Sequence, residues 1–204
     1  MSIWPARWAR GHWAEDEAMQ RTRFPVGPRN TWSNLWYAAA GLMVLVSGPG
    51  GREPVVFAAA LGVLCLGSGL YHAIKEPWAN ALDHVGMYAV FGSLATWAIG
   101  YGWVGDGLWL AMAVGGIVPA VVFSYLVKVN LDVMMGLLVL GASVPAFLWG
   151  TPALAGWGLG IYALGYGCWQ LDRAKHPAVG LWGHALWHGL TGFATAMQFL
   201  ARVP

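Results

Sequence analysis

His184 and His188 stand four residues apart at the start of the last strongly apolar segment of the chain. A helix carries residues i and i+4 on one face, so both imidazoles would point into the same space. Polar side chains deep in an apolar helix are costly to bury and usually serve a function. Because imidazole is a common metal ligand, the pair is a candidate for metal binding.

Three further polar residues belong to the same constellation. His72 lies at the end of one apolar segment, Ser68 precedes it by one helical turn, and Asp83 lies near the start of the next segment. Three neutral imidazoles match a catalytic zinc site, which leaves its fourth position to water. Asp83 could then accept a proton from that water or orient a ligand histidine, and Ser68 could donate a hydrogen bond to a developing oxyanion.

Each of these residues also has a simpler interpretation when taken alone. The histidine pair could make structural hydrogen bonds or ligate a haem. Asp83 could be a helix cap or a favourable charge at a helix start. Ser68 could be a small residue at a helix-packing interface. The placement of all five residues at one level favours a metal site.

The elements that would position these residues are long apolar segments. The chain of 204 residues is 58% hydrophobic and 10% charged, whereas a soluble domain carries about 25% charged residues. Helices are the only sensible structure for a chain of such segments, each close to the roughly 20 residues that cross a bilayer. We therefore predict an all-α, polytopic membrane protein with a seven-transmembrane helix bundle. The predicted segments are 31–47, 54–74, 80–102, 107–126, 131–149, 152–171 and 180–201.

The placement of basic residues predicts the orientation and the domain organisation. Nine of the eleven lysines and arginines fall on the N-terminal side of the predicted bundle, and only Arg52 and Arg202 fall on the other. The N-terminus is therefore expected in the cytoplasm, in a bacterial inner membrane, with no nucleic-acid partner. Residues 1–29 form a cytoplasmic segment that could lie on the membrane surface, and residues 30–204 form one bundle. Cys65 and Cys168 are expected to be core residues rather than a disulfide.

Four stretches of the chain match sequence motifs of a known family. The chain resembles the alkaline ceramidases, within a superfamily of seven-helix membrane hydrolases that includes the adiponectin-receptor-like proteins. The likeness spans residues 30–192. The matching stretches are Asn30-Thr31-Trp32-Ser33-Asn34-Leu35, Gly67-Ser68-Gly69-Leu70-Tyr71-His72, Asp83 eleven residues further on, and His184-Ala185-Leu186-Trp187-His188 followed by Leu190-Thr191-Gly192.

The resemblance implies an activity and a ligand set. It implies a zinc ion held by His72, His184 and His188, with Ser68 and Asp83 completing the site. It also implies hydrolysis of the amide bond of a ceramide-like membrane lipid to a sphingoid base and a fatty acid.

The chain departs from the family at two places. His84 stands where the family usually has a glutamate. The acidic run of residues 15–17 lacks the full family pattern for calcium, which needs six or more oxygen ligands, so we do not expect a calcium site.

Three other functions remain open on the sequence. The first is a hydrolase of another N-acyl or ester lipid, since many bacteria make no sphingolipids. The second is a non-catalytic seven-helix receptor or scaffold in which zinc is structural. The third is a haem-binding electron carrier that uses His72 and one of the two later histidines.

Overall fold

The computed structural model describes residues 24–100, 107–122 and 131–202, and within these ranges the chain is helical without strands. In this described part of the chain, seven long helices follow one short helix. The helices are α2 (Pro28–Ser33), α3 (Leu35–Ser47), α4 (Glu53–Ile74), α5 (Pro77–Gly100), α6 (Leu108–Val121), α7 (Leu131–Trp149), α8 (Pro152–Arg173) and α9 (Gly183–Leu200).

The all-α prediction is confirmed, and each predicted apolar segment coincides with one long helix. Some boundaries differ. The first segment was expected as one helix from Thr31, but the chain turns at Asn34 and forms the separate α2 before it. Helix α5 begins at Pro77 rather than residue 80, because proline fits the first turn of a helix, where its missing N–H costs nothing. The end of the fourth segment and the tail before residue 24, with its acidic run, lie outside the described residues.

The prediction of seven membrane spans is supported in part. Among the described residues, one helix, Glu53–Ile74, is long and apolar enough to cross a bilayer by length and composition. Two shorter apolar stretches, Leu108–Val118 and Val139–Trp149, fall below that length.

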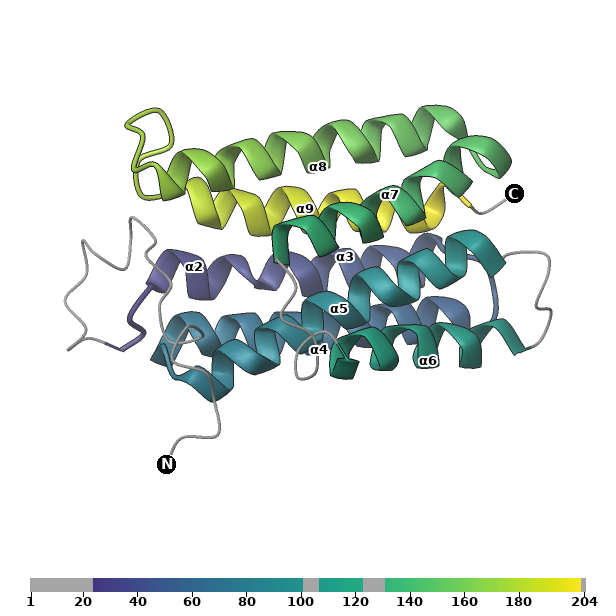
Figure 1. Ribbon diagram of the computed structural model, residues 1–204, viewed down its shortest axis with the longest axis horizontal. Coiled ribbons are helices and arrows are strands. Elements are labelled where there is room, and N and C mark those ends of the chain that lie inside the picture. Colours follow the sequence, from purple (N-terminus) through teal and green to yellow (C-terminus); the bar gives the residue numbers. More distant parts are fainter. Residues whose placement is uncertain (1–23, 101–106, 123–130, 203–204) are drawn as a thin grey trace.

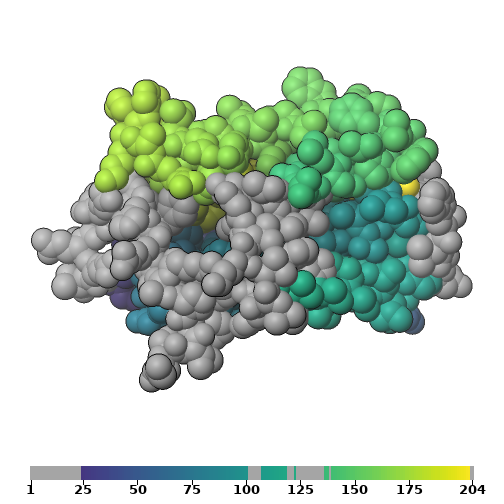
Figure 2. All heavy atoms as spheres, viewed as in Figure 1, coloured from purple at the N-terminus to yellow at the C-terminus, as the bar shows by residue number. Residues whose placement is uncertain are grey.

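The long helices run lengthwise beside one another (Figure 1). Helix α4 packs between α3 and α5, and α9 packs between α8 and α3. In the space-filling view, α8 and α7 form one long side of the molecule and α6 lies on the other (Figure 2). The end of α4, the start of α5, the short α2 and the start of α9 all lie at the same end of the bundle, which is where the candidate site forms.

Three stacked aromatic rings join the helices at the opposite end of the bundle. Phe199 of α9 stacks between Phe57 of α4 and Trp97 of α5, with ring centroids 4.8 Å and 4.7 Å apart. The Trp97 indole N–H also donates a hydrogen bond to the Phe199 carbonyl at 2.9 Å. All three side chains are fully buried, so this stack fixes α4, α5 and α9 relative to one another.

Candidate metal centre

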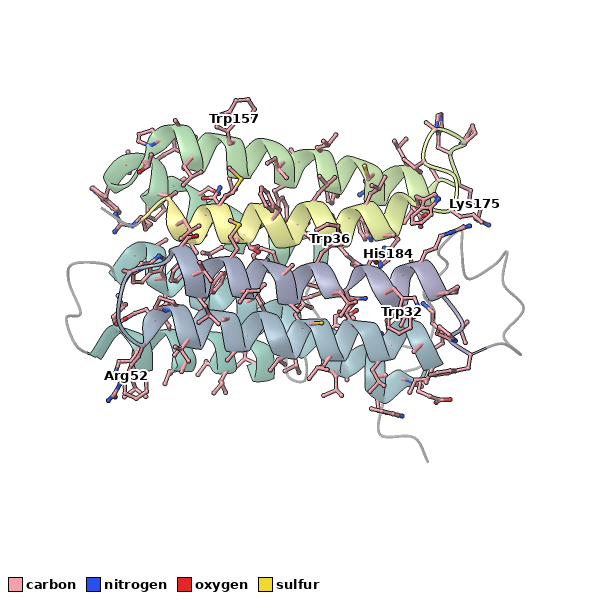
Figure 3. All side chains as sticks on the ribbon, turned by 180° about the vertical axis from the view of Figure 1, so that it is seen from behind. Trp32, Trp36, Arg52, Trp157, Lys175 and His184 are labelled. Atoms are coloured by element: carbon pink, nitrogen blue, oxygen red, sulfur yellow. The ribbon has the colours of Figure 1, made fainter. Side chains whose placement is uncertain are left out.

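Three buried histidines converge at one end of the bundle. His72 comes from the last turn of α4, and His184 and His188 come from the first two turns of α9. One ring nitrogen from each lies within 4.8 Å of the other two, and the side chains are 1%, 5% and 2% exposed. This grouping confirms that the three predicted ligands meet in space. Figure 3 shows His184 at the same end of the molecule as Lys175, with Arg52 at the far end.

The spacing of the His72 and His184 nitrogens is close to that of two ligands on a tetrahedral metal ion. The Nε2 atoms of His72 and His184 lie 3.0 Å apart, and the His184 and His188 ring centroids are 4.5 Å apart. Two nitrogens that each bind zinc at about 2.0–2.1 Å with a tetrahedral angle lie roughly 3.3 Å from each other. Imidazole donors suit zinc and other late transition metals, so the donor set fits the ion without naming it. The direct contact between the His72 and His184 rings leaves no space for a porphyrin between them.

The His188 ring is held by residues of the short helix α2. Its Nδ1 lies 2.8 Å from the Ser33 hydroxyl, which is also bonded to the Asn30 carbonyl at 3.1 Å. The Asn30 carbonyl itself is a further hydrogen-bond partner of the His188 ring. On its other side, the ring packs against Tyr37 with the centroids 5.7 Å apart.

The His72 ring is approached by a lysine from its own helix. Lys75 ends α4 in the left-handed conformation, with φ of 55°, and its backbone N–H bonds to the Tyr71 carbonyl. The side chain folds back, so that Nζ lies 2.9 Å from Nδ1 of His72 and 4.5 Å from the centre of the Tyr71 ring. A positive charge at this place acts electrostatically on all three histidines and on Asp83.

Ser68 and Asp83 meet because α4 and α5 approach closely. A Cβ at Gly67 would lie 2.7 Å from the carbonyl group of Leu82 and 3.0 Å from the Asp83 nitrogen, so only glycine allows this distance between the helices. The Ser68 hydroxyl is thereby a hydrogen-bond partner of the Asp83 carboxyl. Ser68 is 2% exposed and Asp83 is partly buried. The two residues are thus brought together, with Ser68 one turn below His72 on α4.

Residues just before α2 form hydrogen bonds with the end of α4. The backbone N–H groups of Val26 and Gly27 donate hydrogen bonds to the carbonyls of Ala73 and His72, both at 3.0 Å. Carbonyls in the last turn of a helix have no partner within that helix, so such bonds stabilise the helix end. The backbone at His72 is therefore fixed from outside its own helix.

The comparisons with known proteins assign nothing further. No protein-family model matches the chain, and no curated protein matches it either.

Two residues at the site had no assigned role in the sequence. Lys75 was counted only as a basic residue, and Ser33 only as part of a motif. The spacing of Lys75 could have predicted its contact. It follows His72 by three residues, and residues three apart on a helix lie on the same face. The sequence motif included Ser33 but did not indicate that its partner would be His188, which lies 155 residues away in the chain. The structure places Ser33 and Lys75, rather than Asp83, at the Nδ1 atoms of His188 and His72.

Proposed function

We propose that this protein is a zinc-dependent hydrolase embedded in a membrane, which cleaves the amide bond of ceramide-like lipids. The observation that carries the proposal is the group of three buried imidazoles from α4 and α9, with ring nitrogens within 4.8 Å of one another. A bound zinc ion would supply a Lewis acid that activates water and polarises a carbonyl group.

The distribution of apolar side chains supports the membrane location. Large apolar residues on the outer faces of the long helices are strongly exposed, among them Val46 at 77%, Leu66 at 75% and Trp157 at 70%. Polar side chains such as Asn34 and Ser143 are instead buried, at 1% and 2% exposure. Exposed apolar surface of this extent on a helix bundle is typical of contact with lipid.

The basic residues support one orientation in the membrane. Lys75, Arg173 and Lys175 lie at the end that holds the histidines, and Arg52 and Arg202 lie at the other. Positive charge is enriched on the cytoplasmic side of membrane proteins. We therefore place the histidine end, and the N-terminus with it, on the cytoplasmic side of a bacterial inner membrane.

The chain's own residues provide the remaining groups for amide hydrolysis. Asp83 is the general base and acid that takes a proton from water and passes it to the leaving amine. Ser68 donates its hydrogen bond to the Asp83 carboxylate and holds it in place. Once Asp83 has taken the proton from water, the Ser68 hydroxyl is released and donates instead to the oxyanion that develops on the substrate carbonyl. The choice of an amide in a ceramide-like lipid is carried by the resemblance to the alkaline ceramidases, since the matching motifs include all five of these residues.

The first test is metal analysis of the detergent-purified protein. We expect about one zinc per chain, and we expect His72→Ala, His184→Ala and His188→Ala each to lose both zinc and turnover. Asp83→Asn should keep the zinc and lose turnover, because the carboxyl lies outside the group of three nitrogens. His176→Ala is a matched control, since that histidine is exposed on the loop between α8 and α9.

The second test compares substrates by mass spectrometry of the products. Ceramide, other N-acyl lipids and ester lipids are supplied in the same detergent to the wild-type protein. Release of a sphingoid base from ceramide supports the proposed substrate, and release of a fatty acid only from another lipid would replace it. A protein that binds zinc but hydrolyses none of these lipids, and whose zinc content is unchanged by Asp83→Asn, would instead contain a structural metal.

A further inference from the structure

Helix α2 and Asn34 after it have no part in the mechanism proposed above, although they contain buried polar groups beside the site. Asn30 and Asn34 are 0% and 1% exposed, and the Ser33 hydroxyl contacts both the Asn30 carbonyl of its own helix and His188 of α9. Buried polar groups are rarely kept without a hydrogen-bonding purpose. The partners of these residues therefore indicate what α2 does.

The hydrogen bonds around Ser33 favour one tautomer of His188. A hydroxyl has a single proton, and the Asn30 carbonyl 3.1 Å away is an acceptor for that of Ser33. With the Ser33 proton on that carbonyl, the Ser33 oxygen accepts at the 2.8 Å contact and Nδ1 of His188 donates. The Asn30 carbonyl, which can only accept, is a second hydrogen-bond partner of the His188 ring and also calls for a ring N–H as its donor.

This assignment leaves the other nitrogen of His188 free to bind a metal. A neutral imidazole with its proton on Nδ1 presents its lone pair on Nε2. Histidine ligands in metal sites usually donate their second ring N–H to a fixed acceptor, which sets the tautomer and the ring orientation. The Ser33 hydroxyl and the Asn30 carbonyl together form such an acceptor pair.

We propose that Ser33 is a positioning residue for the metal centre, acting through His188. This inference rests on the proposed function, because it gives helix α2 the task of presenting one of the three zinc ligands. Gly27, the residue just before α2, also bonds to the His72 carbonyl through its N–H, so this part of the chain contacts ligands on both α4 and α9. Ser33 does not touch the reacting groups and is not a catalytic residue.

The experiment compares zinc affinity in four purified proteins by competition with a chelator, after removal of bound metal. They are the wild type, Ser33→Ala, Ser33→Thr and the control Ser93→Ala. Ser93 is buried on α5 and donates to carbonyls of its own helix, at Ala89 and Val90, so it shares the local bonding of Ser33 without a histidine partner.

We expect Ser33→Ala to weaken zinc binding about 10- to 100-fold, the usual effect of removing a partner of a ligand histidine. Ser33→Thr keeps the hydroxyl and should recover most of the affinity, and Ser93→Ala should match the wild type. Nitrogen NMR of the metal-free proteins supplies a second readout. His188 should carry its proton on Nδ1 in the wild type and Ser33→Thr, and as a mixture of tautomers in Ser33→Ala.

The outcomes separate the inference from the function on which it rests. Zinc affinity and tautomer that are unchanged in Ser33→Ala would overturn the role of Ser33 while the metal site stands. An equal loss in Ser33→Ala and Ser93→Ala, with no rescue by threonine, would reduce Ser33 to a structural residue. A wild-type protein that binds no zinc would overturn the proposed function itself.

Discussion

Replacing Gly67 with alanine tests the close approach of α4 and α5 on which the Ser68–Asp83 pair depends. The added Cβ would lie 2.7 Å from the carbonyl carbon and oxygen of Leu82, atoms of a helix backbone that cannot rotate away. To reach an ordinary contact of 3.4 Å, the two helices must separate by about 0.7 Å at this level. Overpacking of this kind costs about 1–3 kcal/mol.

Gly69 and Gly62 on the same helix provide matched controls. A Cβ at Gly69 meets its nearest atom at 3.7 Å, and one at Gly62 meets nothing within 4 Å. Alanine is the better helix former by up to about 1 kcal/mol, so both substitutions should be neutral or stabilising.

Thermal unfolding in detergent measures the difference between these variants. Each kcal/mol corresponds to about 2–4 °C in Tm for a chain of this size, so Gly67→Ala should unfold several degrees below Gly69→Ala. Lipid hydrolysis should fall further than stability, because Asp83 moves away from Ser68. A Gly67→Ala protein as stable and as active as Gly69→Ala would refute the close approach and the pairing built upon it.

Three more predictions concern the charge, the core and the metal. Lys75→Met should raise zinc affinity at least about tenfold, because it removes a positive charge 2.9 Å from a ring nitrogen of His72; equal or weaker zinc binding would contradict this. Phe199→Ala should lower stability by about 3–5 kcal/mol, because it leaves a cavity between the Phe57 and Trp97 rings. The control Phe193→Ala should cost far less, since Phe193 is 48% exposed. Equal losses in Tm for the two variants would argue against the aromatic stack. Removing zinc should lower the unfolding free energy by about 2.7 kcal/mol relative to protein at a zinc concentration 100 times the Kd, and an unchanged Tm would show that no zinc binds the folded state.

Much of the fold could be predicted because apolar block length is a strong signal. The seven blocks became seven long helices, and the turn residues between them marked most of the ends. The break at Asn34 was not predicted, since residues 31–47 were taken as one segment although Ser33 and Asn34 near its start are polar. The residues around α2 are held by partners that only the folded structure supplies: the N–H groups of Val26 and Gly27 bond to the end of α4, and Ser33 contacts His188 of α9.

The three histidines could be predicted for a geometric reason. His184 and His188 share a helix face by spacing alone, and His72 reaches the same level because successive helices alternate in direction. The surroundings of the rings could not be predicted in this way. The contact of Ser33 with His188 depends on the packing of α2 against α9, and the contact of Lys75 with His72 depends on the left-handed conformation of Lys75 at the end of α4.

The three candidate metal ligands come from two helices, so metal binding is coupled to the packing of those helices. His72 belongs to α4 and the other two ligands belong to α9, helices that lie more than 100 residues apart in the chain. Helices α2 and α3, which follow one another end to end, contact both of them and so hold α4 and α9 at their separation. A metal bound between α4 and α9 would therefore stabilise the packing of α2 and α3, and a loss of that packing would weaken metal binding. Ser33, at the end of α2 and in contact with His188, is the residue at which this coupling is most directly tested.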